Sequence, residues 1–194
     1  SDAHECLEIP IIAANLHRLI HPAQSQIWAV IRQEDSVKRI VYSVVNTFLG
    51  RMCISGDVTA LSAEQWRAID NGIAFYHKIA PVIKNGMSFR FGPKIKSVRH
   101  PKGWQGMIRV GKEEGAYVTL HTFGGELPDA IEIPLPEGCP ENMAEVYAAG
   151  VDTVADLWIE DRVLRYRPKE GWEAVAVRLG GSLRGGVSEM DSAC

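Results

Sequence analysis

The sequence predicts an α/β segment followed by an all-β segment, namely the last strands and helices of a (β/α)8 barrel and then a C-terminal antiparallel β-sandwich. Residues 1–86 alternate helix-period stretches with short apolar runs. Such alternation is typical of parallel strands joined by right-handed crossovers. After residue 86 short β-like runs are separated by Gly, Pro and Asp, which is typical of a sandwich.

The first helix is predicted over residues 7–20, where apolar side chains recur at helical spacing. Pro10 suits the first turn of a helix, and Pro22 should end it because the residue before proline avoids the α region. Residues 27–31, Ile-Trp-Ala-Val-Ile, are continuously apolar. This run predicts a strand that is buried on both faces.

The strongest helical periodicity lies at residues 37–48. Asp35 or Ser36 can cap the start of this helix, and Gly50 provides a stop signal at its end. The short apolar run at residues 52–54 is the next predicted strand.

A third helix begins at Ser62, which has capping-box spacing to Gln65, and Leu61 can pack against Trp66 as a hydrophobic staple. Asn85-Gly86 ends the helix. Its predicted buried stripe consists of Trp66, Ile69, Ile73, Tyr76, Ile79 or Ala80, and Ile83.

The second half of the chain contains seven predicted strands. They are residues 87–91, 107–110, 116–122, 130–133, 143–147, 163–166 and 173–179. The predicted domains are therefore the end of a barrel at residues 1–86 and an antiparallel β-sandwich at residues 87–179. Residues 180–194 are rich in glycine and predict a flexible tail.

The length of the first segment is too small for a complete barrel. A (β/α)8 barrel takes about 250 residues, whereas residues 1–86 supply two or three strands. An open parallel fragment would leave an unpaired edge, which proteins normally avoid. We therefore expect residues 1–86 to be the end of a barrel whose beginning lies upstream in a longer polypeptide.

Composition restricts the class of partner. The net charge is −3, which gives no electrostatic reason to expect nucleic acid or an anionic membrane as partner. No apolar run reaches the ~18 residues of a membrane span. The four cysteines, Cys6, Cys53, Cys139 and Cys194, form no CxxC pair, so we expect reduced thiols and a cytoplasmic location. The sequence leaves the oligomeric state open, and a homo-oligomer is one of the alternatives.

Metal chemistry is not expected from the sequence. His17 and His21 are four residues apart and could form a metal pair, but Pro22 follows directly and no third ligand is evident. His4-Glu5 could begin an HExxH zinc motif, but position 8 is Glu8. We expect no metal and no organic cofactor.

Several runs, in their order and spacing, resemble the last third of glycoside hydrolase family 36, the α-galactosidase (melibiase) group. The resemblance covers residues 1 to about 179 and is strongest at residues 11–86. The runs that carry it are Leu16-His17-Arg18, Gln24 to Val30, Asp35-Ser36, Ser43 to Thr47, Arg51 to Asp57, and Trp66 with the following residues 73–83.

The resemblance implies a retaining enzyme that hydrolyses terminal α-galactosides by means of two carboxylates. Ser1-Asp2-Ala3-His4-Glu5 looks like the family's acid/base motif, with Glu5 in place of the final Asp, so Asp2 would be the catalytic acid/base. The nucleophile motif is absent from the chain. The resemblance therefore implies an α-galactoside oligosaccharide as ligand of the parent enzyme, and it implies that these 194 residues are inactive alone.

Ser55, Gly56 and Asp57 follow the last predicted barrel strand, at the end that faces the substrate in such barrels. We expect one of them to contact the sugar. The alternative is turn chemistry, with Gly56 supplying backbone freedom and Asp57 bonding nearby N–H groups. Arg32 follows the preceding strand and could reach the same mouth or form a surface salt bridge.

A different class of function remains open at this point. The chain could be a noncatalytic β-sandwich module that binds carbohydrate or packs on a partner. Trp104, Trp158 and Trp172 could stack on sugars in such a module, although packing inside the sandwich is the expected role of these rings.

Overall fold

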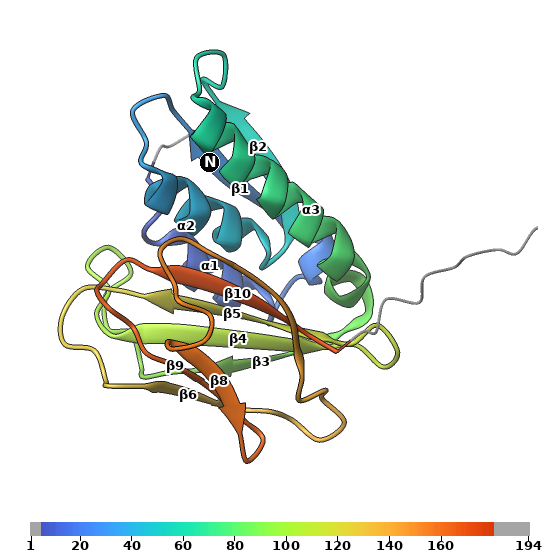
Figure 1. The fold of residues 1–194 in the computed structure, drawn as a ribbon. Helices are drawn as coiled ribbons and strands as arrows, with labels where there is room; N and C mark the ends of the chain where they lie inside the picture. The colour runs from blue at the N-terminus through green and yellow to red at the C-terminus, as the bar shows by residue number, and fades with distance from the viewer. Residues whose placement is uncertain (1–4, 181–194) are drawn as a thin grey trace, which may run out of the picture.

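The computed structural model describes residues 5–180 and arranges them in layers (Figure 1). A small two-stranded parallel sheet lies on one side of a layer of helices. A five-stranded antiparallel sheet lies on the other side, and a three-stranded sheet covers the far face of the five-stranded one. This arrangement is an α/β segment followed by antiparallel sheets, while a complete barrel is absent from the described residues. Asp2 and residues 181–194 lie outside the described part of the chain.

The helices are α1 (Ile9–Leu16), α2 (Val37–Thr47) and α3 (Ala63–Asn85), with a short 3-10 helix at Pro22–Gln24. The strands are β1 (Gln26–Ile31), β2 (Arg51–Gly56), β3 (Met87–Phe91), β4 (Trp104–Val110), β5 (Ala116–Thr122), β6 (Ile131–Pro134), β7 (Met143–Ala148), β8 (Leu157–Glu160), β9 (Val163–Tyr166) and β10 (Ala174–Leu179).

The pair β1–β2 is parallel, as the alternation of elements predicted, and α2 is the crossover between its strands. Ile27, Ala29 and Ile31 are buried toward the helices, whereas Trp28 and Val30 are only half-buried. The prediction of burial on both faces was therefore wrong for the described chain. The continuous apolar run meets a layer of helices on one side only.

The two antiparallel sheets pack face to face around one apolar core. The strand order is β3-β4-β5-β10-β7 in the larger sheet and β6-β9-β8 in the smaller one. Ile108, Val118 and Val177 from the first sheet meet Ile133 and Leu164 from the second. All seven predicted strands are present, with ends shifted by up to three residues.

Strand β8 was missed by the sequence analysis. It pairs with β9 through a tight hairpin in which Asp161 and Arg162 both have positive φ, at 51° and 59°. Two left-handed residues define the turn that best matches the twist of a two-residue hairpin. Asn-Gly is the usual sequence of such a turn, so Asp-Arg gave no signal.

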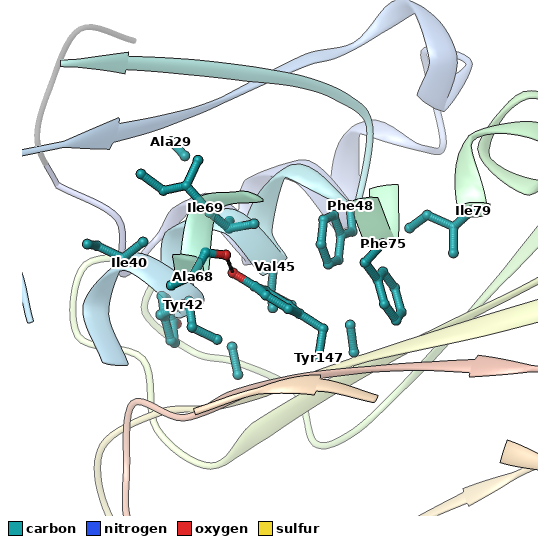
Figure 2. Close-up of a cluster of buried hydrophobic side chains, with 14 of the residues drawn as sticks. Ala29, Ile40, Tyr42, Val45, Phe48, Ala68, Ile69, Phe75, Ile79 and Tyr147 are labelled. Carbon is teal, nitrogen blue, oxygen red and sulfur yellow. Dashed lines mark hydrogen bonds between the residues drawn. The ribbon is translucent and has the colours of Figure 1, made fainter. Parts of the chain in front are cut away.

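A second core joins the helices to the other face of the five-stranded sheet. Phe48 stacks on Phe75 with ring centroids 5.2 Å apart, and Tyr147 of β7 packs against both rings. Figure 2 shows these rings between the helices and the sheet, with the Tyr147 hydroxyl donating a hydrogen bond to the carbonyl of Ala68, 2.9 Å away. Gly72 allows this approach, because a Cβ atom there would lie 2.9 Å from the same hydroxyl oxygen.

Helices α2 and α3 begin with the side-chain caps that the sequence predicted. Ser36 accepts a hydrogen bond from the N–H of Arg39, and Ser62 forms a complete capping box with Gln65. Helix α1 is shorter than predicted, since it ends at Leu16, and Pro22 begins the 3-10 helix instead of ending α1.

The predicted stripe of α3 is wrong at its first position. Trp66 is 39% exposed, while Ala68, Gly72 and Phe75 are among the residues that face the core. Small residues let α2 and the sheet approach α3, and a stripe drawn through large side chains alone passes over them. No helix within residues 5–180 combines the length and apolar character needed to cross a membrane.

Candidate functional site

The carboxyl ends of β1 and β2 lie side by side. Val30 is level with Ser55, and Ile31 is level with Gly56. Because the strands are parallel, the segments that follow them leave the same edge of the sheet, where α/β proteins build their sites. The structure thus brings Arg32 to the same edge as the predicted Ser55 to Asp57 run.

Gly56 is required by the close approach of the two strands. Its φ is 109°, and a Cβ atom would lie 2.0 Å from the carbonyl oxygen of Ile31. A side chain at this position would therefore meet both backbone strain and a backbone clash. The result is an exposed stretch of bare backbone at the end of β2.

Asp57 is exposed and bonds to its own turn. Its Oδ1 accepts hydrogen bonds from the Thr59 hydroxyl at 2.7 Å and from the Thr59 N–H at 3.2 Å. These bonds, the hydroxyl first, lower the pKa of the Asp57 carboxyl. This is the turn chemistry that we considered as the alternative. The ionised carboxylate keeps lone pairs that can accept further hydrogen bonds.

The loop after β1 is held in place by buried polar contacts. The N–H of Arg32 donates to Oδ2 of the buried Asp35 at 2.8 Å, and Arg39 lies 2.9 Å from the other carboxylate oxygen. The amide of Gln65 donates to the carbonyl oxygens of Gln33 and Asp35 at 2.9 and 2.7 Å. The Arg32 side chain is exposed, with Glu34 as its ion-pair partner at 3.8 Å.

The sequence analysis did not predict these hydrogen bonds that hold the loop after β1. Asp35 was considered only as a helix cap, and Gln65 only as the second half of a capping box. The capping box was nevertheless a signal in the sequence for these contacts. It fixes the Gln65 side chain at the start of α3, and Gln65 there reaches the loop after β1.

The predicted acid/base, Asp2, lies outside the described residues. The neighbouring Glu5 carboxylate accepts hydrogen bonds from the N–H groups of Cys6 at 3.0 Å and Leu7 at 3.1 Å. Cys6 and Leu7 border a hollow of about 320 Å³ whose walls also include Tyr42 and Trp172. The role of Asp2 stays a prediction.

The two histidines considered as a metal pair are both engaged. His17 donates from Nε2 to the carbonyl of Leu49 at 2.6 Å, and its Nδ1 lies 3.3 Å from the Arg109 guanidinium. Burial first, and the charge of Arg109 second, lower the pKa of His17 to about 4. His21 Nδ1 accepts from the N–H of Ala23. No group of three potential ligands that could hold a metal occurs among residues 5–180.

The sandwich tryptophans are packing residues in this structure. Trp104 and Trp172 are half-buried against the two cores. The guanidinium of Arg167 covers the half-buried Trp158 ring at 4.8 Å from its centroid. Stacking on a sugar needs an open ring face, so these contacts favour the packing interpretation.

No protein-family model matches the sequence, and no curated protein does. Solved structures do match. The galactosidase domain of an α-galactosidase–sucrose kinase superposes with a TM-score of 0.61 at 17% identity, over 92% of this chain and 25% of the other. The Lactobacillus brevis α-galactosidase matches with a TM-score of 0.62 at 12% identity, over 94% and 26%.

A variant of a family 36 α-galactosidase from Geobacillus stearothermophilus, in complex with raffinose, gives a TM-score of 0.61 at 11% identity, over 91% of this chain and 25% of that one. The chain therefore spans about a quarter of the length of these solved proteins. At such identities the similarity concerns the fold. The fold of nearly the whole described chain matches a segment that makes up about one quarter of the length of each of these family 36 α-galactosidase structures.

Proposed function

We propose that this chain is the C-terminal part of a retaining glycoside hydrolase of the family 36 type, with β1 and β2 as the last strands of its catalytic barrel and the sandwich as its C-terminal domain. The observation that carries the proposal is the parallel β1–β2 pair, which is covered by helices on one face only. This pair lies in a fold that matches about a quarter of the length of an α-galactosidase chain. A barrel would cover the remaining face and edges.

The chemistry follows from the need for two carboxyl groups. Retaining hydrolysis uses a nucleophile and an acid/base about 5–5.5 Å apart. We assign the acid/base to Asp2 and assign no residue of this chain as the nucleophile. The 194 residues alone are therefore expected to be inactive, and an α-galactoside oligosaccharide is the proposed ligand of the longer enzyme, without a metal or organic cofactor.

The end of β2 has a binding role in this proposal. The bare backbone at Gly56 lets a sugar ring approach the strand end closely. The ionised Asp57 carboxylate and the Ser55 hydroxyl supply acceptors for sugar hydroxyls. The fixed loop at Asp35 holds the neighbouring strand end in place.

The test compares the 194-residue chain with the same chain joined to the sequence encoded directly upstream of it. Release of p-nitrophenol from p-nitrophenyl α-galactoside is expected from the joined protein only. Asp2→Asn should abolish that release, and the exposed helix residue Asp70 provides the control Asp70→Asn. Turnover by the 194-residue chain alone, or full activity of Asp2→Asn in the joined protein, would contradict the proposal.

The noncatalytic carbohydrate-binding module loses support from the structure. Its best candidates for stacking, Trp104, Trp158 and Trp172, are half-buried. Isothermal titration of the 194-residue chain with galactose, raffinose and stachyose is expected to give no heat of binding. Millimolar or tighter binding that Trp158→Ala abolishes would favour the module instead.

A further inference from the structure

The edge strand β3 of the five-stranded sheet has an open side. Among the described residues β3 pairs with β4 alone. Two of its apolar side chains face solvent, Met87 at 69% and Phe89 at 36% exposure. The opposite edge, β7, differs, because Glu145 there is paired with Lys78 and Arg178. Charges on an edge discourage further pairing, and β3 lacks such a balanced set.

The two faces of β3 carry different side chains. Ser88 accepts a hydrogen bond from Arg109 at 2.9 Å, and Arg90 donates to Gln105 at 3.1 Å, so both point toward the helix layer. Since side chains alternate along a strand, Met87 and Phe89 point to the other face, where the three-stranded sheet lies.

A basic groove follows β3 on the helix side. It has a volume of about 620 Å³ and runs between the end of α1 and β3. Arg18, His21 and Arg90 line it, and no acidic residue does. Burial, and then the charge of Arg18, lower the pKa of Arg90. Neither arginine forms a salt bridge within residues 5–180, so the groove has an uncompensated positive charge.

A second, apolar groove follows β3 on the sandwich side. Its volume is about 300 Å³, and its walls include Met87, Phe89 and Pro136. Its two charged wall residues, Lys112 and Glu137, have opposite signs. The open edge of β3 thus runs between a basic groove and an apolar groove.

We propose that the β3 edge binds an extended segment of a partner protein in which acidic and apolar residues alternate. The segment would add to the sheet as a sixth strand, with main-chain hydrogen bonds to β3. Because its side chains alternate between the two faces, its carboxylates would reach Arg18 and Arg90 while its apolar side chains cover Met87 and Phe89.

Charge decides between this partner and a second copy of the chain. In a symmetric pairing with Phe89 opposite its equivalent, the arginines of both copies would lie on one face of the joined sheet. Arg90 of one copy would then lie diagonally across from Arg90 of the other, and these like charges would repel each other. A segment that carries carboxylates on that face avoids this repulsion and neutralises the positive charge of the groove.

The experiment uses the full 194-residue chain and a labelled, end-capped peptide of eight residues that alternates valine and glutamate. Fluorescence anisotropy is expected to show saturable binding that weakens with added salt. Arg18→Glu and Arg90→Glu should each weaken binding about tenfold, since reversal replaces an attraction by a repulsion of similar size. The control Arg67→Glu, at an exposed arginine of α3, should leave binding unchanged.

Three further peptides separate strand addition from simple charge attraction. A peptide with the same residues in two blocks, a valine–lysine peptide, and the valine–glutamate peptide with alternate amides N-methylated are all expected to lose binding. Equal binding of any of the three would overturn the proposal. It would also be overturned by an absence of binding up to millimolar peptide, or by a dimer of the chain that the peptide does not dissociate.

Discussion

The five-stranded sheet and the two-stranded sheet of this molecule are buried to different extents. The larger sheet is covered on both faces, by the helices on one side and the three-stranded sheet on the other. The smaller sheet has helices on one face, while Trp28 and Val30 on its other face stay half-buried. The sandwich half thus completes its own core within this chain, whereas β1 and β2 are covered on one face only by the described residues.

The helix layer connects the two sheets. Phe48 of the α2 end and Phe75 of α3 pack against Tyr147 of β7, so the α/β segment is anchored on the sandwich. These contacts explain how a parallel sheet of only two strands is held in the described chain. The predicted boundary at residue 86 therefore separates two types of structure that share one core, and its status as a domain boundary stays a prediction.

Disrupting the core shared by the helices and the five-stranded sheet should destabilise the protein most. Phe48→Ala removes a fully buried ring and should lower the free energy of unfolding by about 3–5 kcal/mol. Urea unfolding followed by tryptophan fluorescence measures the change. Ile12→Ala at the exposed face of α1 is the control, and similar losses from both variants would show that this core does not anchor the helices.

The second effect is a dependence on pH that arises at the helix–sheet contact. Burial lowers the pKa of His121 to about 3, and His17 has a pKa of about 4. Both histidines are neutral in the folded state, while the unfolded chain takes up protons near pH 6.5. Their stabilisation is therefore complete well above pH 6.5 and declines as the pH falls from there, toward 4 for His17 and toward 3 for His121.

Each of these histidines should contribute a slope of up to about 1.4 kcal/mol per pH unit in that window. His121→Phe removes one of the two titrations and places an apolar ring beside Tyr42, whose ring meets His121 edge-on at 5.4 Å. The variant's free energy of unfolding should fall less steeply between pH 6 and 4. Parallel curves for the two proteins would contradict the assignment.

A smaller effect is expected at the hydrogen bond between the sheet and α3. Tyr147→Phe removes the donor to the carbonyl of Ala68 and should cost about 1 kcal/mol. Amide hydrogen exchange should show faster opening of α3 around Ala68 and an unchanged sandwich core. Equal acceleration in β5 and β10 would mean that the helix and the sheet open together.

The smallest effect is expected on the open face of β1–β2. Trp28→Ser and Cys53→Ser alter half-buried neighbours that are level across the pair, and each should change the stability of this chain by less than about 1 kcal/mol. In the joined protein of the proposed function the same changes should cost about 2–5 kcal/mol, because the face would then be core. Equal effects in both proteins would argue against a barrel.

The sequence predicted those elements whose signals are local. The capping box at Ser62 and the hairpin connection at residues 111–115 are properties of a few neighbouring residues, and both are present. Trp66 was placed wrongly because the side of α3 that is buried depends on small residues facing distant elements. Strand β8 was missed because its hairpin uses Asp161-Arg162, which carries no glycine.

The candidate site was predictable in position and less so in chemistry. The level alignment of Ser55 and Gly56 with the end of β1 follows from parallel pairing, and the structure has it. The bonds of Asp57 to Thr59 and of Gln65 to the loop at Asp35 depend on side-chain geometry that spacing does not specify. Sugar contact by Ser55, Gly56 or Asp57, and the role of Asp2, remain predictions.

The helix–sheet core also sets an order of events during synthesis. Ala174 and Ala176 of β10 belong to the core that buries α2, although about 130 residues separate α2 from β10. At 5–20 residues per second the ribosome needs on the order of ten seconds to make that distance. Throughout this interval the apolar face of α2 lacks the cover that β10 provides in the folded chain.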